Sequence, residues 1–331
     1  MSVDMTTNYL GLELRHPVMS GASPLADDLD TVKRLEDAGA AAICLRSLFE
    51  EQLTSQQMDS HRYFDTPSDA TDEALDYFPS TSDFALGPDA YLEQIAKIRN
   101  SVDVPVIGSL NGVSPGGWLQ YARLIEQAGA SALELNMYTL ASDPDVSASD
   151  LEKQELEIVR AVRETISIPI AVKLSPFYSA LPNFVRELEA AGVAGVIMFN
   201  RLYEPDIDPE ALELDRTLRL STPSELLLRL RWLAILSSRT RLSLACSGGV
   251  HTFIGALKAI MAGATAVQMV SALLRYGVDN LRLVINGLHD WFEEHGYATV
   301  DEARGSMDDS HAPNPSAYER ANYMQLLLGD A

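Results

Sequence analysis

The segment Leu133–Ser142, LELNMYTLAS, begins as an apolar strand and ends in polar side chains. Asn136, Tyr138 and Thr139 bring an amide, a phenol and a hydroxyl to a place where such a strand would be buried. Polar groups cost free energy when they are buried without a partner. These residues therefore indicate a ligand above the strand, and the amide suits the edge of a heterocycle that both donates and accepts hydrogen bonds.

A lysine ends a second apolar segment, IPIAVK, which runs from Ile168 to Lys173. An ammonium group buried there is costly unless something compensates its charge. Either Lys173 meets an anionic or electron-rich ligand, or it pairs with Glu134 from the first segment. We favour the ligand.

Several other kinds of site find no support in the sequence. The six histidines show no H-x-x-x-H or H-x-H spacing, so no metal site is predicted. No G-x-S-x-G segment occurs, which disfavours a hydrolase of that type. Cys44 and Cys246 lie in apolar runs, where buried thiols are favoured over a disulfide or a metal pair.

The composition limits the class of protein. The 331 residues are 47% hydrophobic, enough for one large domain. The net charge of −22, from 25 basic and 47 acidic residues, disfavours nucleic acid and anionic membranes as partners. We find no apolar run of roughly 18 residues and no signal-peptide pattern, so we expect a cytoplasmic protein.

One junction occurs four times along the chain. In each copy an amphipathic helix ends at a glycine, two or three small residues follow, and an apolar run without alternation begins. Glycine closes a helix by adopting the left-handed conformation, and continuous apolar strands are typical of a parallel sheet covered on both faces. The four glycines are Gly39, Gly129, Gly192 and Gly263.

Together with the apolar runs between these junctions, we count eight strands, most of them followed by a helix. This alternation predicts an α/β protein with the (β/α)8 TIM barrel fold. A doubly wound open sheet is the alternative. It calls for a G-x-G-x-x-G turn after the first strand, which the segment MSGASPLA does not supply.

No linker divides the chain, so residues 1–331 are predicted to form a single barrel domain. Three segments lie outside the repeat. Residues 1–16 read as an N-terminal β-hairpin lid at the barrel bottom. Residues 49–88 form a long, acidic insertion loop after the second strand, and residues 305–331 a polar C-terminal tail.

Catalysis in such barrels takes place at the carboxyl ends of the strands. The loops after the seventh and eighth strands often bind phosphate through backbone N–H groups. Here they begin with SGGV (Ser247–Val250) and VSAL (Val270–Leu273), and we favour a phosphate site over two tight turns without a ligand. The other predicted strand ends are Ser20–Ser23, Arg46–Ser47, Ser109 with Asn111, Asn136–Thr139, Lys173 and Asn200.

Five blocks of the sequence resemble a known family. They are NYLGLELRHPVMSGASPL, ALELNM, AVKLSPF, ACSGGVHTFIGALKAIMAGATAVQMVSAL and LHDWFEEHGYATVDEARG. These blocks, and the order in which they occur, resemble those of the dihydroorotate dehydrogenases, especially the soluble class 1 enzymes. The resemblance extends from about Asn8 to Gly305.

The resemblance implies a barrel that holds flavin mononucleotide (FMN), with Lys173 beside the N1–C2=O edge of the ring, where a cation stabilises reduced flavin. Its implied phosphate contacts are Gly248, Gly249, Val270 and Ser271. Its implied ring contacts are Gly21, Ala22, Ser23, Asn136, Lys173 and Asn200. Ser47 and Ser221 complete the predicted cofactor set.

The sequence departs from the family on the substrate side. In the family, the loop after the fourth strand reads Asn–x–Ser–Cys–Pro–Asn, and its Cys or Ser takes a proton from the substrate while hydride passes to the flavin. Thr139 occupies that position here, so we expect it to act as the base through a water or a neighbour. Arg46 replaces a lysine. The Asn–x–Met–Gly–x–x–Asn motif has no counterpart between Phe49 and Pro88. The predicted substrate contacts are Arg46, Asn111, Tyr138 and Tyr203.

The resemblance implies an FMN-dependent oxidoreductase that converts dihydroorotate to orotate in pyrimidine biosynthesis. Electrons would pass to a soluble acceptor such as fumarate or to a redox protein, and we expect a homodimer. One alternative is a related flavin enzyme with another substrate. Others are a phosphate-binding barrel lyase or synthase without flavin and a catalytically silent relative that binds a partner.

Overall fold

The computed structural model describes residues 3–49, 88–112, 115–137, 139–201, 204–215, 217, 219–313 and 318. Within this part, parallel strands close into an eight-stranded barrel, because β4 pairs with both β3 and β6. The predicted TIM barrel is therefore confirmed. The barrel strands are β3 (Val18–Ser23), β4 (Ile43–Leu45), β6 (Val106–Asn111), β7 (Ala132–Asn136), β8 (Ile170–Leu174), β9 (Gly195–Met198), β12 (Ser243–Ser247) and β13 (Ala266–Met269). A two-residue strand, β5 (Leu48–Phe49), continues the line of β4 along β6.

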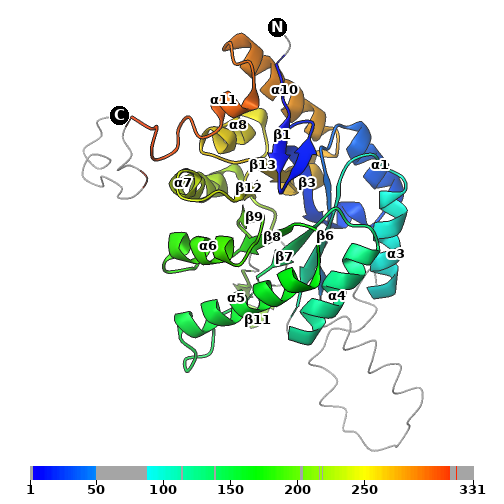
Figure 1. The fold of residues 1–331 in the computed structure, drawn as a ribbon, viewed down its shortest axis with the longest axis vertical. Coiled ribbons are helices and arrows are strands. Elements are labelled where there is room, and N and C mark those ends of the chain that lie inside the picture. Colours follow the sequence, from blue (N-terminus) through cyan, green and yellow to red (C-terminus); the bar gives the residue numbers. More distant parts are fainter. Residues whose placement is uncertain are drawn as a thin grey trace, which may run out of the picture.

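Helices surround the barrel on its outside (Figure 1). The longer ones are α1 (Leu29–Asp37), α3 (Pro88–Arg99), α4 (Pro115–Gln127), α5 (Ala148–Thr165), α6 (Leu181–Ala190), α7 (Leu226–Ser237), α8 (Phe253–Met261) and α10 (Asn280–Glu294). The short ones are η1 (Pro24–Ala26), η4 (Pro223–Glu225), α9 (Ser271–Tyr276) and α11 (Val300–Ala303). None of the described helices is both long and apolar enough to cross a membrane.

The glycine junctions behave as the sequence predicts. Gly39, Gly129, Gly192 and Gly263 have φ angles of 105°, 97°, 85° and 114°, in the left-handed region. At Gly39, for example, the glycine N–H donates to Glu36 O, and the next N–H donates to Leu35 O, which satisfies the helix end. Each helix is thus turned back toward the barrel within three residues of its last turn.

Two layers of apolar side chains hold the barrel together. The larger layer lies between strands and helices. It includes the fully buried side chains of Leu35, Ile125, Val159 and Leu233. The smaller layer fills the end of the barrel where the strands begin. There the ribbon of β1 (Thr7–Tyr9) and β2 (Leu12–Leu14) packs Tyr9, Leu10 and Leu14 against small strand residues.

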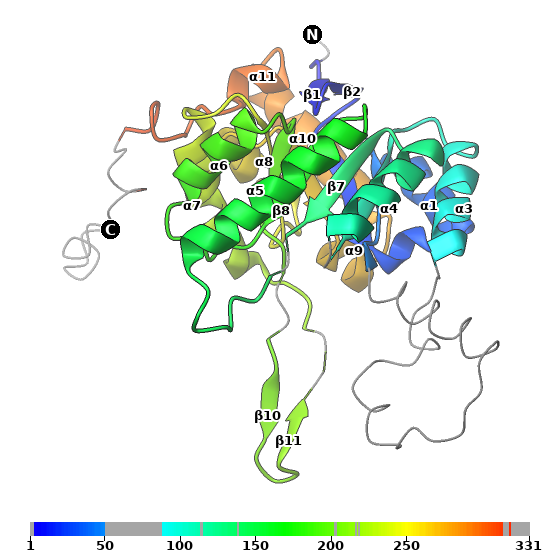
Figure 2. The same cartoon turned by 60° about the horizontal axis from the view of Figure 1, so that its bottom comes forward.

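A second hairpin interrupts the connection from β9 to α7. Its strands, β10 (Asp206–Asp208) and β11 (Glu213–Asp215), pair antiparallel, with Ile207 opposite Leu214. Figure 2 shows this hairpin projecting from the end of the barrel opposite β1 and β2. The sequence pattern did not predict this hairpin.

The predicted outlying segments are only partly described. The insertion loop 49–88 lies outside the described residues except at its ends. The start of the C-terminal tail is fastened to the barrel helices, because Gly305 N–H donates to Ile260 O and Asp309 N–H donates to Ala234 O. Both cysteines are buried free thiols, as predicted, and burial raises the pKa of Cys246 to about 12.

Candidate active site

A cavity of about 260 Å³ opens over the carboxyl ends of β3, β8, β9, β12 and β13; we term it the strand-end cavity. Most of the predicted cofactor residues meet there. These are Ala22, Ser23, Lys173, Asn200, Ser221, Gly248, Gly249, Val270 and Ser271. Gly21 lies beside the lining instead, where a Cβ atom would come within 2.8 Å of Val270 Cγ2.

Hydrogen bonds tie three loops together at one end of the strand-end cavity. Ser221 Oγ donates to Ser271 Oγ at 2.8 Å, and it accepts from the Gly249 N–H at 3.2 Å. Gly248 and Gly249 have φ angles of 93° and 81°, and a Cβ on Gly249 would lie 2.5 Å from Leu226 N. The backbone there takes a shape that only glycine permits without strain. This is the geometry expected of a backbone cradle for phosphate.

Arginines that the sequence analysis overlooks line the same end. Arg229 is 6% exposed, and it donates to the carbonyl oxygens of Ser247 at 3.0 Å and Glu225 at 2.9 Å. Arg201 and Arg219 also line the cavity. The signal for Arg229 was present in the sequence as a charge inside the apolar helix LLLRLRWLAILS. Arg201 lies 3.9 Å from Glu225 and Arg219 pairs with Asp206, so the described guanidinium group here without a carboxylate partner within 4 Å is that of Arg229, which makes this end of the cavity suited to an anion.

Lys173 is not a lone charge, because it pairs with Glu134, while the predicted contact of Lys173 with a ligand stays a prediction. Its Nζ lies 3.1 Å from Glu134 Oε1, and Glu134 is fully buried. Gln268 donates to the other oxygen of Glu134 at 2.8 Å, and the Cys44 thiol lies 3.5 Å from it. The alternative, pairing with Glu134, is what the structure shows. The ammonium still forms part of the floor of the strand-end cavity.

Asn136 also has partners within the protein. Its Nδ2 donates to Ser47 Oγ at 2.9 Å and to Ser109 Oγ at 2.7 Å, and the two hydroxyls lie 3.0 Å apart. Neither Asn136 nor Ser47 lines the strand-end cavity. The cost of burying this amide is therefore met, at least for its donors, by serines rather than by a ligand.

The predicted substrate residues do not gather in the strand-end cavity. Arg46 pairs with Asp27 at 3.2 Å. Thr139 is exposed and lines two neighbouring cavities, of about 320 and 450 Å³, and Asn111 lines the larger of these. Tyr138 and Tyr203 lie outside the described residues.

Comparison with known proteins identifies the family. The model of the dihydroorotate dehydrogenase family matches residues 4–292, which is most of the chain. The chain belongs to the dihydroorotate dehydrogenase family. Its members are flavin-dependent dehydrogenases that act on CH–CH bonds.

Relatives within the dihydroorotate dehydrogenase family are distant. A putative dihydroorotate dehydrogenase A (fumarate) from Aeropyrum pernix is 28% identical, over 64% of this chain and 71% of that protein. The catalytic subunit of dihydroorotate dehydrogenase B (NAD(+)) from Thermoplasma acidophilum is 25% identical, over 91% of this chain and 98% of the relative. The corresponding subunit from Pyrococcus furiosus is 30% identical, over 65% of this chain and 72% of the relative.

The strand-end cavity fits the flavin nucleotide that this family uses. In the described part of the chain, Ser23 Oγ and Arg201 Nη1 are buried without a hydrogen-bond partner, although Arg201 Nη1 lies 3.9 Å from Glu225 Oε1, and both residues line the cavity. Buried polar atoms of this kind are costly unless a ligand or water satisfies them. Ser23 lies on the β3 side, where the ring is expected, and Arg201 lies beside the anion end.

Proposed function

We propose that the chain is an FMN-dependent oxidoreductase that oxidises a small substrate at the carboxyl ends of the barrel strands. The observation that supports it most is the strand-end cavity, which joins a glycine-lined, arginine-rich end to a floor made by Lys173. Bound FMN would supply a hydride acceptor, N5 of its ring.

Each part of the strand-end cavity has a role in this proposal. The phosphate would lie against Ser221, Gly248, Gly249, Val270 and Ser271, with Arg201 and Arg229 providing positive charge. The ring would lie over Ala22 and Ser23, with Asn200 and Lys173 near it. Glu134 and Gln268 would hold the Lys173 ammonium in place, so that the ammonium end of a fixed ion pair faces the ring.

Proton removal from the substrate is assigned to Thr139 in this proposal. Its hydroxyl would accept the proton from the substrate carbon and pass its own proton on to a water or a neighbouring group. Asn111, which lines one of the two cavities that Thr139 also lines, would bind the substrate. Arg46, Tyr138 and Tyr203 remain proposed substrate contacts on the sequence alone.

Dihydroorotate is the first substrate to test, because the relatives are named for it. The acceptor would be fumarate or a redox protein, and the enzyme a homodimer. A different substrate is the second candidate, and one observation favours it. The guanidinium of Arg46 is already paired with Asp27, and the ammonium of Lys173 with Glu134, so neither is free to hold a carboxylate.

Colour and thermal stability test the proposed function directly. We expect the purified protein to be yellow, or added FMN to bind and raise its melting temperature. If the protein is colourless and does not bind added FMN, the alternative of a phosphate-binding barrel without flavin would be favoured. If flavin is bound, its bleaching under anaerobic dihydroorotate separates the first substrate from the second.

Arg229 offers a sharper test of where the phosphate lies. Arg229→Gln should weaken FMN binding by about tenfold or more, because it removes a buried charge from the anion end. Riboflavin, which lacks the phosphate, should lose little affinity. Arg231→Gln, an exposed change on the same helix, is the matched control and should bind FMN normally. Equal losses for FMN and riboflavin would move the phosphate away from Arg229.

A further inference from the structure

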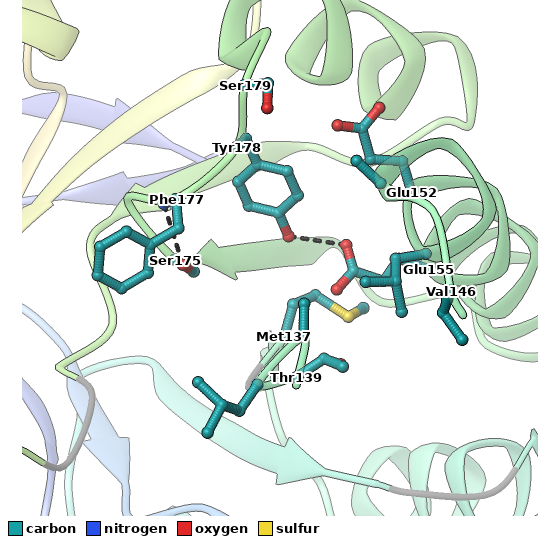
Figure 3. A pocket seen from close by; sticks show the side chains of 13 residues that line it. Met137, Thr139, Val146, Glu152, Glu155, Ser175, Phe177, Tyr178 and Ser179 are labelled. Carbon is teal, nitrogen blue, oxygen red and sulfur yellow. Dashed lines mark hydrogen bonds between the residues drawn. The ribbon is translucent and has the colours of Figure 1, made fainter. Parts of the chain in front are cut away.

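The smaller of the two cavities lined by Thr139 has features that favour one class of ligand. It has a volume of about 320 Å³ and lies between helix α5 and the segments that follow β7 and β8 (Figure 3). We term it the Glu155 cavity. It shares no lining residue with the strand-end cavity, and its walls are largely apolar.

A buried carboxyl group faces this cavity. Glu155 is 8% exposed, and its Oε2 accepts a hydrogen bond from the Tyr178 hydroxyl at 2.7 Å. Figure 3 shows the two groups pointing toward each other, with Met137 and Thr139 below them in this view. Among the described residues, Tyr178 is the side chain that hydrogen-bonds to Glu155, and the bond involves one of the two carboxyl oxygens.

The position of this carboxyl group is fixed by packing. The Tyr178 ring stacks on Phe184 with ring centres 4.5 Å apart, which holds its hydroxyl against Glu155. A buried carboxylate is ordinarily compensated by a cation. The described lining of the Glu155 cavity contains no lysine, arginine or histidine, and Glu152 adds a second acid. Burial, and then the charge of Glu152, raise the pKa of Glu155.

We propose that the Glu155 cavity binds a small protonated amine with an apolar body, whose ammonium group lies against Glu155. The ammonium would donate to the other carboxylate oxygen and supply the missing positive charge. The apolar body would cover Leu140, Val146 and Phe177, which are 74%, 40% and 75% exposed. The rings of Phe177 and Tyr178 also favour a cation.

This proposal bears on the substrate of the enzyme. Thr139 lines the same cavity, so a molecule held there lies beside the residue assigned as base. In that respect the inference rests on the proposed function. It selects an amine over an anion such as dihydroorotate, whose carboxylate would face Glu155 and Glu152.

Methionine methyl NMR on the full chain tests the binding itself. Met137 lines the cavity, and its ¹³C-methyl signal can be assigned with Met137→Leu. The probes are benzylamine, benzyl alcohol and benzoate, which share one ring and differ in charge. Benzylamine should shift the Met137 signal saturably, benzyl alcohol should bind about tenfold more weakly or worse, and benzoate should not bind. No saturable shift with benzylamine, or equal affinity for the alcohol, would overturn the proposal.

Charge-removing variants locate the site. Glu155→Gln keeps a hydrogen-bond acceptor for Tyr178 and should lower benzylamine affinity about tenfold without changing benzyl alcohol binding. Glu157→Gln is the matched control, because Glu157 is an exposed acid on the same helix, and it should bind benzylamine normally. Unchanged benzylamine affinity in Glu155→Gln would refute the site.

Two further arms keep the test decisive. Should Glu155→Gln lose its cooperative melting transition, Glu152→Gln replaces it; a weakened benzylamine affinity supports the site, and an unchanged affinity counts against it. The titration is run with and without FMN. The amine should bind in both cases, so a failure of FMN binding would remove the proposed cofactor and leave the amine site standing.

Discussion

Lys173 Nζ and Glu134 Oε1 lie 3.1 Å apart, with side chains 7% and 0% exposed. The two residues lie on neighbouring strands, Glu134 on β7 and Lys173 on β8, and they are two positions apart in register, since Lys173 stands opposite Asn136. Gln268 and Cys44 complete the surroundings of the carboxylate. The floor of the strand-end cavity is therefore an ion pair held within the barrel.

Removing one member of this pair should be much worse than removing both charges. We expect Lys173→Met to lower the free energy of unfolding by about 3–5 kcal/mol, because it leaves the buried Glu134 charge uncompensated. Adding Glu134→Gln should restore a large part of that loss. Urea unfolding of the single and double variants measures the difference. Lys97→Met, which breaks the exposed pair with Glu93, is the control and should cost at most about 1 kcal/mol.

We expect that Gly249 cannot be replaced, because a side chain there would clash with the backbone. Gly11, which has a similar φ angle and no such clash, separates this steric effect from backbone strain. Gly11 and Gly249 have φ angles of 84° and 81°, but a Cβ on Gly11 would meet nothing within 4 Å, whereas one on Gly249 would lie 2.5 Å from Leu226 N. Gly11→Ala should cost about 1–2 kcal/mol of unfolding free energy from the backbone alone. Gly249→Ala should cost clearly more and should weaken FMN binding. Thermal unfolding with and without FMN compares them, and equal effects would contradict the cradle.

His16 gives the fold a specific dependence on pH. The residue is 6% exposed, and its Nδ1 accepts from the Val18 N–H, which requires a neutral ring. Burial lowers the pKa of His16 from 6.5 to about 4, with a smaller contribution from the charge of Arg15. At a pH between these two pKa values, His16 is protonated in the unfolded chain and neutral in the folded chain. Stability should therefore fall by about 3 kcal/mol as the pH drops from about 6.5 to about 4.

Variants isolate this contribution from that of the other titrating groups. Urea midpoints of His16→Gln should decline less steeply than those of the unaltered protein as the pH falls from 6.5 to 4. His295→Gln changes an exposed histidine and should track the unaltered protein. Parallel declines in all three would mean that His16 does not carry the effect.

If FMN binds and a substrate bleaches it, the role of Thr139 can be tested in the reductive half-reaction. Thr139→Ala should slow the bleaching by about 100-fold or more, since general base catalysis contributes on this order. Thr139→Ser keeps the hydroxyl and should retain most of the rate. If the alanine variant bleaches at the original rate, Thr139 has no part in proton removal.

The barrel was predictable because its signals are local. Each glycine junction is contained in about ten residues, and apolar strands without alternation indicate a covered parallel sheet. The partners of the polar side chains were not predictable in the same way. Lys173 meets Glu134 and Gln268, which lie 39 and 95 residues away, and only the closed barrel brings them together.

The same limit applies to the rest of the site. The amide of Asn136 is satisfied by Ser47 and Ser109, 89 and 27 residues distant, so a polar strand end did not by itself require a ligand. The phosphate end was easier, because Gly248, Gly249 and Ser271 stand in the loops where barrels commonly bind anions. Arg229 was missed because it arrives from the middle of an apolar helix.

The ribbon of β1 and β2 also affects how small molecules can reach the strand-end cavity. In the described part of the chain, Tyr9, Leu10 and Leu14 pack across one end of the barrel, and the strand-end cavity lies at the other end. If FMN binds in the strand-end cavity, an electron donor and an electron acceptor that react with it in turn would both approach from that end. Each should then act as an obstacle to the other at high concentration.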